Sequence, residues 1–120
     1  MEVKGLVNLN SNDQGVGFYN FLEANILLNI VVTNGASLNQ NSNKNGFYAY
    51  VDSGADVNIF VEDGGVFSSC ANTVDSIKVD TFTASGVRFL GDGEYTYTCD
   101  QSTVVGTFVV PPVCQACPVS

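Results

Sequence analysis

Apolar and polar residues alternate in short runs along nearly the whole chain, and this period of two constrains the fold more than any other feature. Successive side chains of a β-strand point to opposite faces, so the alternation predicts half-buried strands. No window of a dozen residues carries apolar groups at helical spacing without interruption. We therefore expect an all-β chain of about eight to ten short strands. The runs are Val3–Leu9, Val16–Leu22, Ile26–Val32, Phe47–Val51, Val57–Val61, Ile77–Phe82, Val87–Leu90, Tyr95–Cys99 and Val104–Val110.

Turn signals separate these runs at intervals of about 8–12 residues, a rhythm typical of β-sandwiches and barrels. They are Asn34-Gly35, Asn45-Gly46, Asp63-Gly64-Gly65, Ser85-Gly86 and Asp92-Gly93. Asp52-Ser53-Gly54-Ala55 has the length of a hairpin connection. With 120 residues the chain fits one domain. We expect a two-sheet β-sandwich, jelly-roll-like, over residues 1–110, with Ile26–Val32 covered on both faces.

Residues 111–120 differ from the rest because three prolines fall within eight positions. Proline lacks the backbone N–H that helices and sheet interiors require, so this segment is predicted to be extended. We expect an extended C-terminal arm that leaves the domain and reaches a neighbouring subunit. Its candidate contact residues are Pro111, Pro112, Val113 and Pro118.

Four cysteines are the disulfide candidates: Cys70, Cys99, Cys114 and Cys117. The Cys-x-x-Cys pair near the end of the chain has a proline on each side, which excludes the helix that a redox motif needs. Four cysteines allow three pairings, and we favour a Cys70–Cys99 bond. Cys114 and Cys117 would then join each other or an adjacent subunit. A zinc site built from all four, or four reduced thiols, are the alternatives.

The composition argues against catalysis and against nucleic acid. The chain has no histidine and only four basic residues, which removes the usual general bases, nucleophile pairs and catalytic zinc ligands. A net charge of −8 repels phosphate backbones. No apolar run approaches the length of a membrane-spanning helix. We expect a protein that is not an enzyme and has no cofactor, no metal site and no nucleic-acid or membrane partner.

Two further features are candidates for contacts. The polar segment 34–45 is predicted to be a long surface loop, with Leu38, Asn39, Gln40 and Asn41 as residues that touch a subunit or ligand. Tyrosines at 19, 48, 50, 95 and 97 fit a sugar-binding face, although most such tyrosines simply cover a half-buried sheet. The carboxylates near strand ends match no calcium loop and are expected to be solvated turn residues.

These observations predict a non-enzymatic structural protein that assembles with other protein subunits. The favoured role is a bacteriophage virion surface component such as a capsid decoration protein. A disulfide-linked or strand-adding filament subunit and a carbohydrate-binding module are the alternatives. The mean hydropathy of +0.16 predicts a homo-oligomer, most simply a trimer, within a larger shell or filament. No secretion signal is recognisable at Met1, so we expect a virion or extracellular protein synthesised without one.

Overall fold

The computed structural model describes residues 2–8, 15–98, 102–105, 108–109 and 117. The described residues contain thirteen strands and no helix, so the all-β prediction is confirmed. The strands are β1 (Glu2–Val3), β2 (Leu6–Asn8), β3 (Val16–Leu22), β4 (Leu27–Val32), β5 (Ser37–Asn39), β6 (Asn45–Val51), β7 (Asp56–Val61), β8 (Val66–Ser69), β9 (Asp75–Thr81), β10 (Gly86–Leu90), β11 (Glu94–Tyr97), β12 (Ser102–Val105) and β13 (Phe108–Val109).

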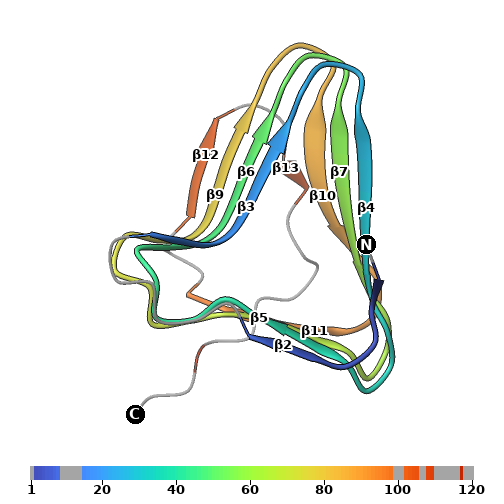
Figure 1. Ribbon diagram of the computed structural model, residues 1–120, viewed down its shortest axis with the longest axis vertical. Coiled ribbons are helices and arrows are strands. Elements are labelled where there is room, and N and C mark those ends of the chain that lie inside the picture. The colour runs from blue at the N-terminus through green and yellow to red at the C-terminus, as the bar shows by residue number, and fades with distance from the viewer. Residues whose placement is uncertain (1, 9–14, 99–101, 106–107, 110–116, 118–120) are drawn as a thin grey trace.

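The strands form three sheets, which enclose the core as the sides of a triangle (Figure 1). Sheet A has the order β1-β4-β7-β10-β13, sheet B the order β11-β8-β5-β2, and sheet C the order β12-β9-β6-β3. The chain visits the three sheets in turn, and every registered strand pair is parallel. The molecule is therefore a parallel β-helix. The expected two-sheet jelly roll is not found, because a jelly roll consists of antiparallel strands.

Each coil of the helix takes 29 or 30 residues, as the starts of β4, β7 and β10 at Leu27, Asp56 and Gly86 show. Equivalent corners carry residues with positive φ, a backbone conformation that lets the chain turn sharply. Gly35 and Gly64 occupy the corner between sheets A and B, with φ of 80° and 83°. The other two corners repeat the feature at Ser42 and Ala71, and at Asn25, Gly54 and Ala84.

The interior consists of side chains from successive coils stacked in register. Ile30, Ile59 and Phe89 form one such row in sheet A, and all three are buried. One aromatic ring from each sheet meets at the centre: Phe47, Phe67 and Phe89 have ring centroids 5.4–5.7 Å apart. Because these rows run from one coil to the next, the side chains of each coil are buried in large part by those of its neighbours.

Two local predictions are corrected by this topology. Residues 52–55 do not close a hairpin, since β6 and β7 belong to different sheets and the segment turns a corner. The polar segment 34–45 is not a long loop, since it contains β5 and packs Leu38 into the core. The part of the chain that the structure describes has no helix long and apolar enough to span a membrane.

Candidate functional site

The outer face of sheet C carries a group of aromatic side chains, here called the aromatic ladder: Tyr19, Phe21, Tyr48, Tyr50 and Phe82. Tyr19 lies opposite Tyr48, and Phe21 opposite Tyr50, in the register of β3 with β6. Tyr19, Phe21 and Phe82 are 51%, 58% and 47% exposed. The ladder exists because alternate residues of each strand face outward and the parallel register aligns them from coil to coil.

The rings of the ladder pack mainly on one another. Phe21 and Tyr50 are stacked with centroids 5.0 Å apart and planes only 3° from parallel. Tyr50 and Phe82 meet edge to face at 5.2 Å, and Tyr19 and Tyr48 are tilted at 4.9 Å. Each ring of the ladder therefore contacts at least one other ring, while Tyr19, Phe21 and Phe82 stay about half exposed.

A polar group borders the ladder on β9. The Tyr48 hydroxyl donates a 2.7 Å hydrogen bond to the Asp80 carboxylate, and the Lys78 ammonium lies 4.8 Å from the centre of the Tyr48 ring. The hydrogen bond to Asp80, followed by burial, raises the pKa of Tyr48 to about 12. Tyr48 therefore keeps its proton, and remains a hydrogen-bond donor, to higher pH than an ordinary tyrosine.

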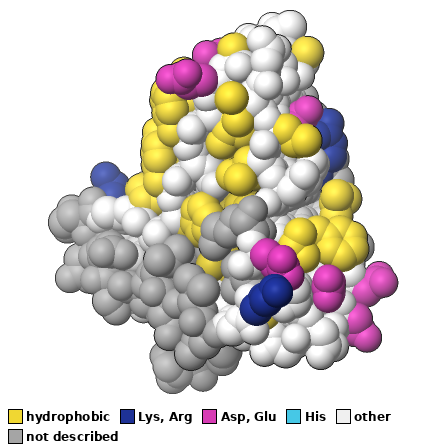
Figure 2. All heavy atoms as spheres, turned by 45° about the vertical axis from the view of Figure 1, so that its right-hand side comes forward, with side chains coloured by type: hydrophobic (Ala, Val, Ile, Leu, Met, Phe, Trp, Pro, Cys, Tyr) yellow, Lys and Arg dark blue, Asp and Glu magenta, His cyan; other side chains and the backbone are white. Residues whose placement is uncertain are grey.

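The outer face of sheet A carries a second apolar group, here called the sheet A row: Val31, Phe60 and Leu90. These residues are aligned by the parallel register, and Phe60 and Leu90 are 43% and 38% exposed. Figure 2 turns this side toward the viewer and shows hydrophobic side chains at the surface with acidic groups nearby. Beside the row, Arg88 pairs with Asp56 at 3.0 Å.

The outer face of sheet B is different, because its described outward side chains, on β5, β8 and β11, are polar apart from Val66. Ser37, Asn39, Ser68 and Thr96 occupy these positions, with Glu94 exposed at the start of β11. Sheets A and C therefore present apolar side chains to the outside, whereas sheet B presents a surface suited to water.

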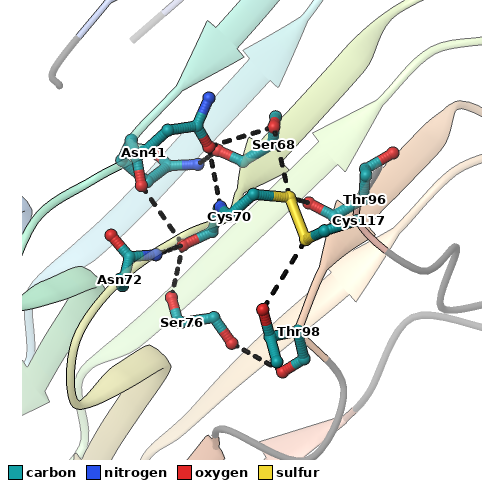
Figure 3. The surroundings of a disulfide bond; sticks show 10 residues. Asn41, Ser68, Cys70, Asn72, Ser76, Thr96, Thr98 and Cys117 are labelled. Atoms are coloured by element: carbon teal, nitrogen blue, oxygen red, sulfur yellow. Dashed lines mark hydrogen bonds between the residues drawn. A yellow bond between two sulfur atoms is a disulfide. The ribbon is translucent and has the colours of Figure 1, made fainter. Parts of the chain in front are cut away.

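A disulfide joins Cys70, in the corner between β8 and β9, to Cys117 (Figure 3). Our prediction of a Cys70–Cys99 bond is therefore wrong, because Cys70 already has Cys117 as its partner. The Cys70 amide donates to the Asn41 side-chain oxygen at 2.7 Å, and Thr98 Oγ1 lies 3.6 Å from the Cys117 sulfur. Cys99 and Cys114 lie outside the described residues.

The disulfide also bears on the predicted C-terminal arm. Cys117 is the part of segment 111–120 that the structure describes, and its bond holds that point against the body of the helix. The expected arm residues Pro111, Pro112, Val113 and Pro118 lie outside the described residues.

The predicted contact residues divide between the interior and the surface. Leu38 and Gln40 are completely buried, while Asn39 and Asn41 are partly exposed. The Asn41 side-chain oxygen accepts from Ser68 as well as from Cys70, so it braces the corner that holds the disulfide.

The five candidate tyrosines also divide in this way. Tyr19, Tyr48 and Tyr50 belong to the aromatic ladder, whereas Tyr95 and Tyr97 are buried in the core. Burial raises the pKa of both buried tyrosines. The Tyr95 hydroxyl reaches the carbonyl oxygens of Leu90 and Ile59, at 2.6 and 3.2 Å.

One open depression of about 310 Å³ lies at the corner between sheets A and B, and its lining includes the carboxylates of Asp63, Asp92 and Glu94. Within the described residues no group of three or more His, Cys, Asp or Glu side chains is placed to hold a metal ion. We therefore regard the depression as a solvated corner.

Comparison with known proteins gives no relative: no family model, no curated protein and no solved structure matches this chain. Functional inference therefore depends on the surfaces described above.

Proposed function

We propose that this protein is a non-enzymatic structural protein that acts by assembling with copies of itself. The observation that carries the proposal is the contrast among the three outer faces. Large apolar side chains are exposed in aligned groups on sheets A and C, and the outward positions of sheet B are mostly polar. Apolar patches that continue across several strands are typical of surfaces that a partner covers.

The sheet A row supports lateral contact between copies. Phe60 stands between Val31 and Leu90 in the parallel register, so the three side chains form one strip along the helix axis. A strip of this kind buries most effectively against a second straight β-helix laid alongside. Two or three copies in a closed arrangement satisfy this requirement, and a trimer is the simplest assembly around a threefold axis.

Two biological settings need a module of this kind. A capsid decoration protein on a bacteriophage virion and a subunit of an extracellular filament both need such an assembling module. Closed symmetry favours the first, and open head-to-tail contacts favour the second. The Cys70–Cys117 disulfide supports a virion or extracellular location, since disulfides persist in oxidising surroundings.

Carbohydrate binding is the second candidate, because Tyr19, Tyr48 and Tyr50 share one face with Asp80. Sugar rings stack on the open faces of aromatic side chains, and here the faces of Phe21 and Tyr50 lie against each other. This arrangement favours assembly over sugar binding. Saccharide affinity that is lost in Tyr48→Ala would reverse the preference.

Sedimentation equilibrium over a range of protein concentrations tests the proposal. We expect the wild-type protein to self-associate, and Phe60→Asp to weaken association at least tenfold, because it places a charge in the apolar strip. Ser37→Asp on the polar outer face of sheet B is the matched control and should leave association unchanged. A wild-type protein that stays monomeric at several hundred micromolar contradicts the proposal.

A further inference from the structure

Within the part of the chain that the structure describes, strand β3 forms an edge of sheet C at the first coil of the helix. Among the described residues it pairs with β6 on one side, and it is the last strand of sheet C. The Leu22 carbonyl accepts a hydrogen bond from the Asp52 amide at 3.0 Å, so the backbone groups of Leu22 face β6. Because these groups alternate along a strand, those of Tyr19 and Phe21 point away from β6, toward the open side.

The side chains of β3 are also incompletely covered. Phe18 points into the core and lies 5.6 Å from Phe47, yet it remains only partly buried. On the outer face, Tyr19 and Phe21 are each more than half exposed. Phe18, Tyr19 and Phe21 therefore lack the cover that the corresponding side chains have in the inner coils, whereas Asn20 and Leu22 of the same strand are buried.

Natural proteins protect such edges with lysine, proline, bulges or short strands. The sequence of β3, Val-Gly-Phe-Tyr-Asn-Phe-Leu, has none of these residues and no charge, and it extends over seven residues. An edge of this length and composition is suited to pairing with another strand.

We infer that β3 pairs antiparallel with β3 of a second copy, around a twofold axis at Tyr19. This inference deepens the proposed self-assembly and rests on it. The pairing places Tyr19 opposite its own copy and Phe21 opposite Gly17, whose missing side chain leaves room for an aromatic ring. Phe18 lies opposite Asn20 on the core side.

A twofold pair of β3 strands fits this edge better than a head-to-tail stack of copies does. In a head-to-tail stack β3 would instead meet β12, the last described strand at the opposite edge of sheet C, so two different surfaces would have to fit each other. The twofold arrangement pairs the strand along its whole length and uses the same surface on both copies, as an isologous dimer requires.

Site-specific cross-linking tests the twofold axis. In the proposed pair the two Tyr19 Cα atoms lie about 5.5 Å apart, within the range that a disulfide can bridge. The two Phe21 Cα atoms lie about 14 Å apart, beyond that range. After mild oxidation of the full chain, Tyr19→Cys should give at least tenfold more dimer linked between the introduced cysteines than Phe21→Cys, as read by peptide mapping.

A second measurement separates this interface from the sheet A row. Tyr19→Lys should weaken association at least tenfold in sedimentation equilibrium, whereas Phe82→Lys, on the ladder but away from the edge, should not. If the wild type associates and Phe60→Asp disrupts it while Tyr19→Lys does not, the β3 interface is wrong and self-assembly stands. Equal cross-linking of the two cysteine variants also overturns the interface, and a monomeric wild type overturns both proposals.

Discussion

Strands β3 and β6 are neighbours in sheet C with the same alternation of aromatic and smaller residues, but they differ in what covers them. Phe47 of β6 is completely buried between coils, while Phe18, its partner in register, is only partly buried. On the outer face, Tyr48 and Tyr50 are half-buried, whereas Tyr19 and Phe21 are mostly exposed. In a β-helix, burial is therefore decided by the presence of a neighbouring coil as much as by residue type.

The largest expected loss of stability comes from truncating Phe47, and Phe18, its partner in register, gives the comparison. Phe47→Ala should lower the free energy of unfolding by about 3–5 kcal/mol, because it leaves a cavity among buried rings. Phe18→Ala should cost about 1–2 kcal/mol in dilute protein, since less of its surface is buried. Denaturant unfolding of both variants at low concentration measures the difference.

The same two variants also show whether the first coil is less well covered than the inner coils. If Phe18→Ala costs as much as Phe47→Ala in dilute protein, the end coil is as well covered as the inner coil. A Phe18→Ala cost that grows with protein concentration would instead show that a second copy covers this side chain.

The segment that contains Cys117 differs from β3 because a disulfide ties it covalently to the body of the helix. Cys117→Ser should lower the free energy of unfolding by about 2–4 kcal/mol, because it frees a loop between cysteines that are 47 positions apart. Thr98→Val is the control, since it removes the 3.6 Å contact to sulfur and keeps the bond. Intact-mass analysis confirms the oxidation state, and an unchanged stability of Cys117→Ser in oxidised protein contradicts the assignment.

A smaller effect is expected at the corner between sheets B and C. The Asn72 side-chain oxygen accepts a buried 2.9 Å hydrogen bond from the Asn43 amide. Asn72→Leu leaves that amide without its partner and should cost about 1–3 kcal/mol. Asn58→Leu, which removes an exposed bond to Asn29 on sheet A, should change stability by less than about 0.5 kcal/mol in the same unfolding assay. Equal losses of stability in Asn72→Leu and Asn58→Leu would mean that the hydrogen bond at the corner is no more buried than the exposed one on sheet A.

The smallest effect concerns the ladder at β6. Asp80→Asn should bring the pKa of Tyr48 from about 12 back toward its ordinary value, because the hydrogen bond to Asp80 is the main cause of the rise. The stability that Tyr48 contributes is complete below pH 10 and is lost as the pH rises through 10 to 12. Absorbance titration of the wild type and Asp80→Asn, with Tyr48→Phe to identify the signal of Tyr48, measures this pKa. An unchanged pKa in Asp80→Asn refutes the assigned hydrogen bond.

The sequence predicts most of the longer strands because alternation is local, but it does not predict the short strands β5 and β8. Val16–Leu22 matches β3 exactly as expected, and Val57, Ile59 and Val61 face the core of β7. Alternation does not reveal which strands pair or in which direction, so the sandwich prediction failed. The informative signal was the equal spacing of Asn34-Gly35, Asp63-Gly64 and Asp92-Gly93, which recur every 29 residues. A fixed period of this length indicates stacked repeats.

The candidate surfaces were only partly predictable for the same reason. Tyr48 and Tyr95 look equivalent in sequence, but one faces outward from sheet C and the other lies in the core. The Cys70–Cys117 pairing depends on where the end of the chain lies relative to the β8–β9 corner, which residue spacing does not encode. Ile26–Val32 was expected to be covered on both faces, and the outer face of β4 is open in the single chain.

Hydrogen–deuterium exchange at single-residue resolution gives the most direct test of whether a second chain completes the open side of β3. In concentrated wild-type protein, the amides of Tyr19 and Phe21 should exchange slowly, and dilution or the Tyr19→Lys substitution should make them exchange fast. The Leu22 amide, which faces β6, should remain protected throughout. Fast exchange at Tyr19 and Phe21 at every concentration would contradict the account.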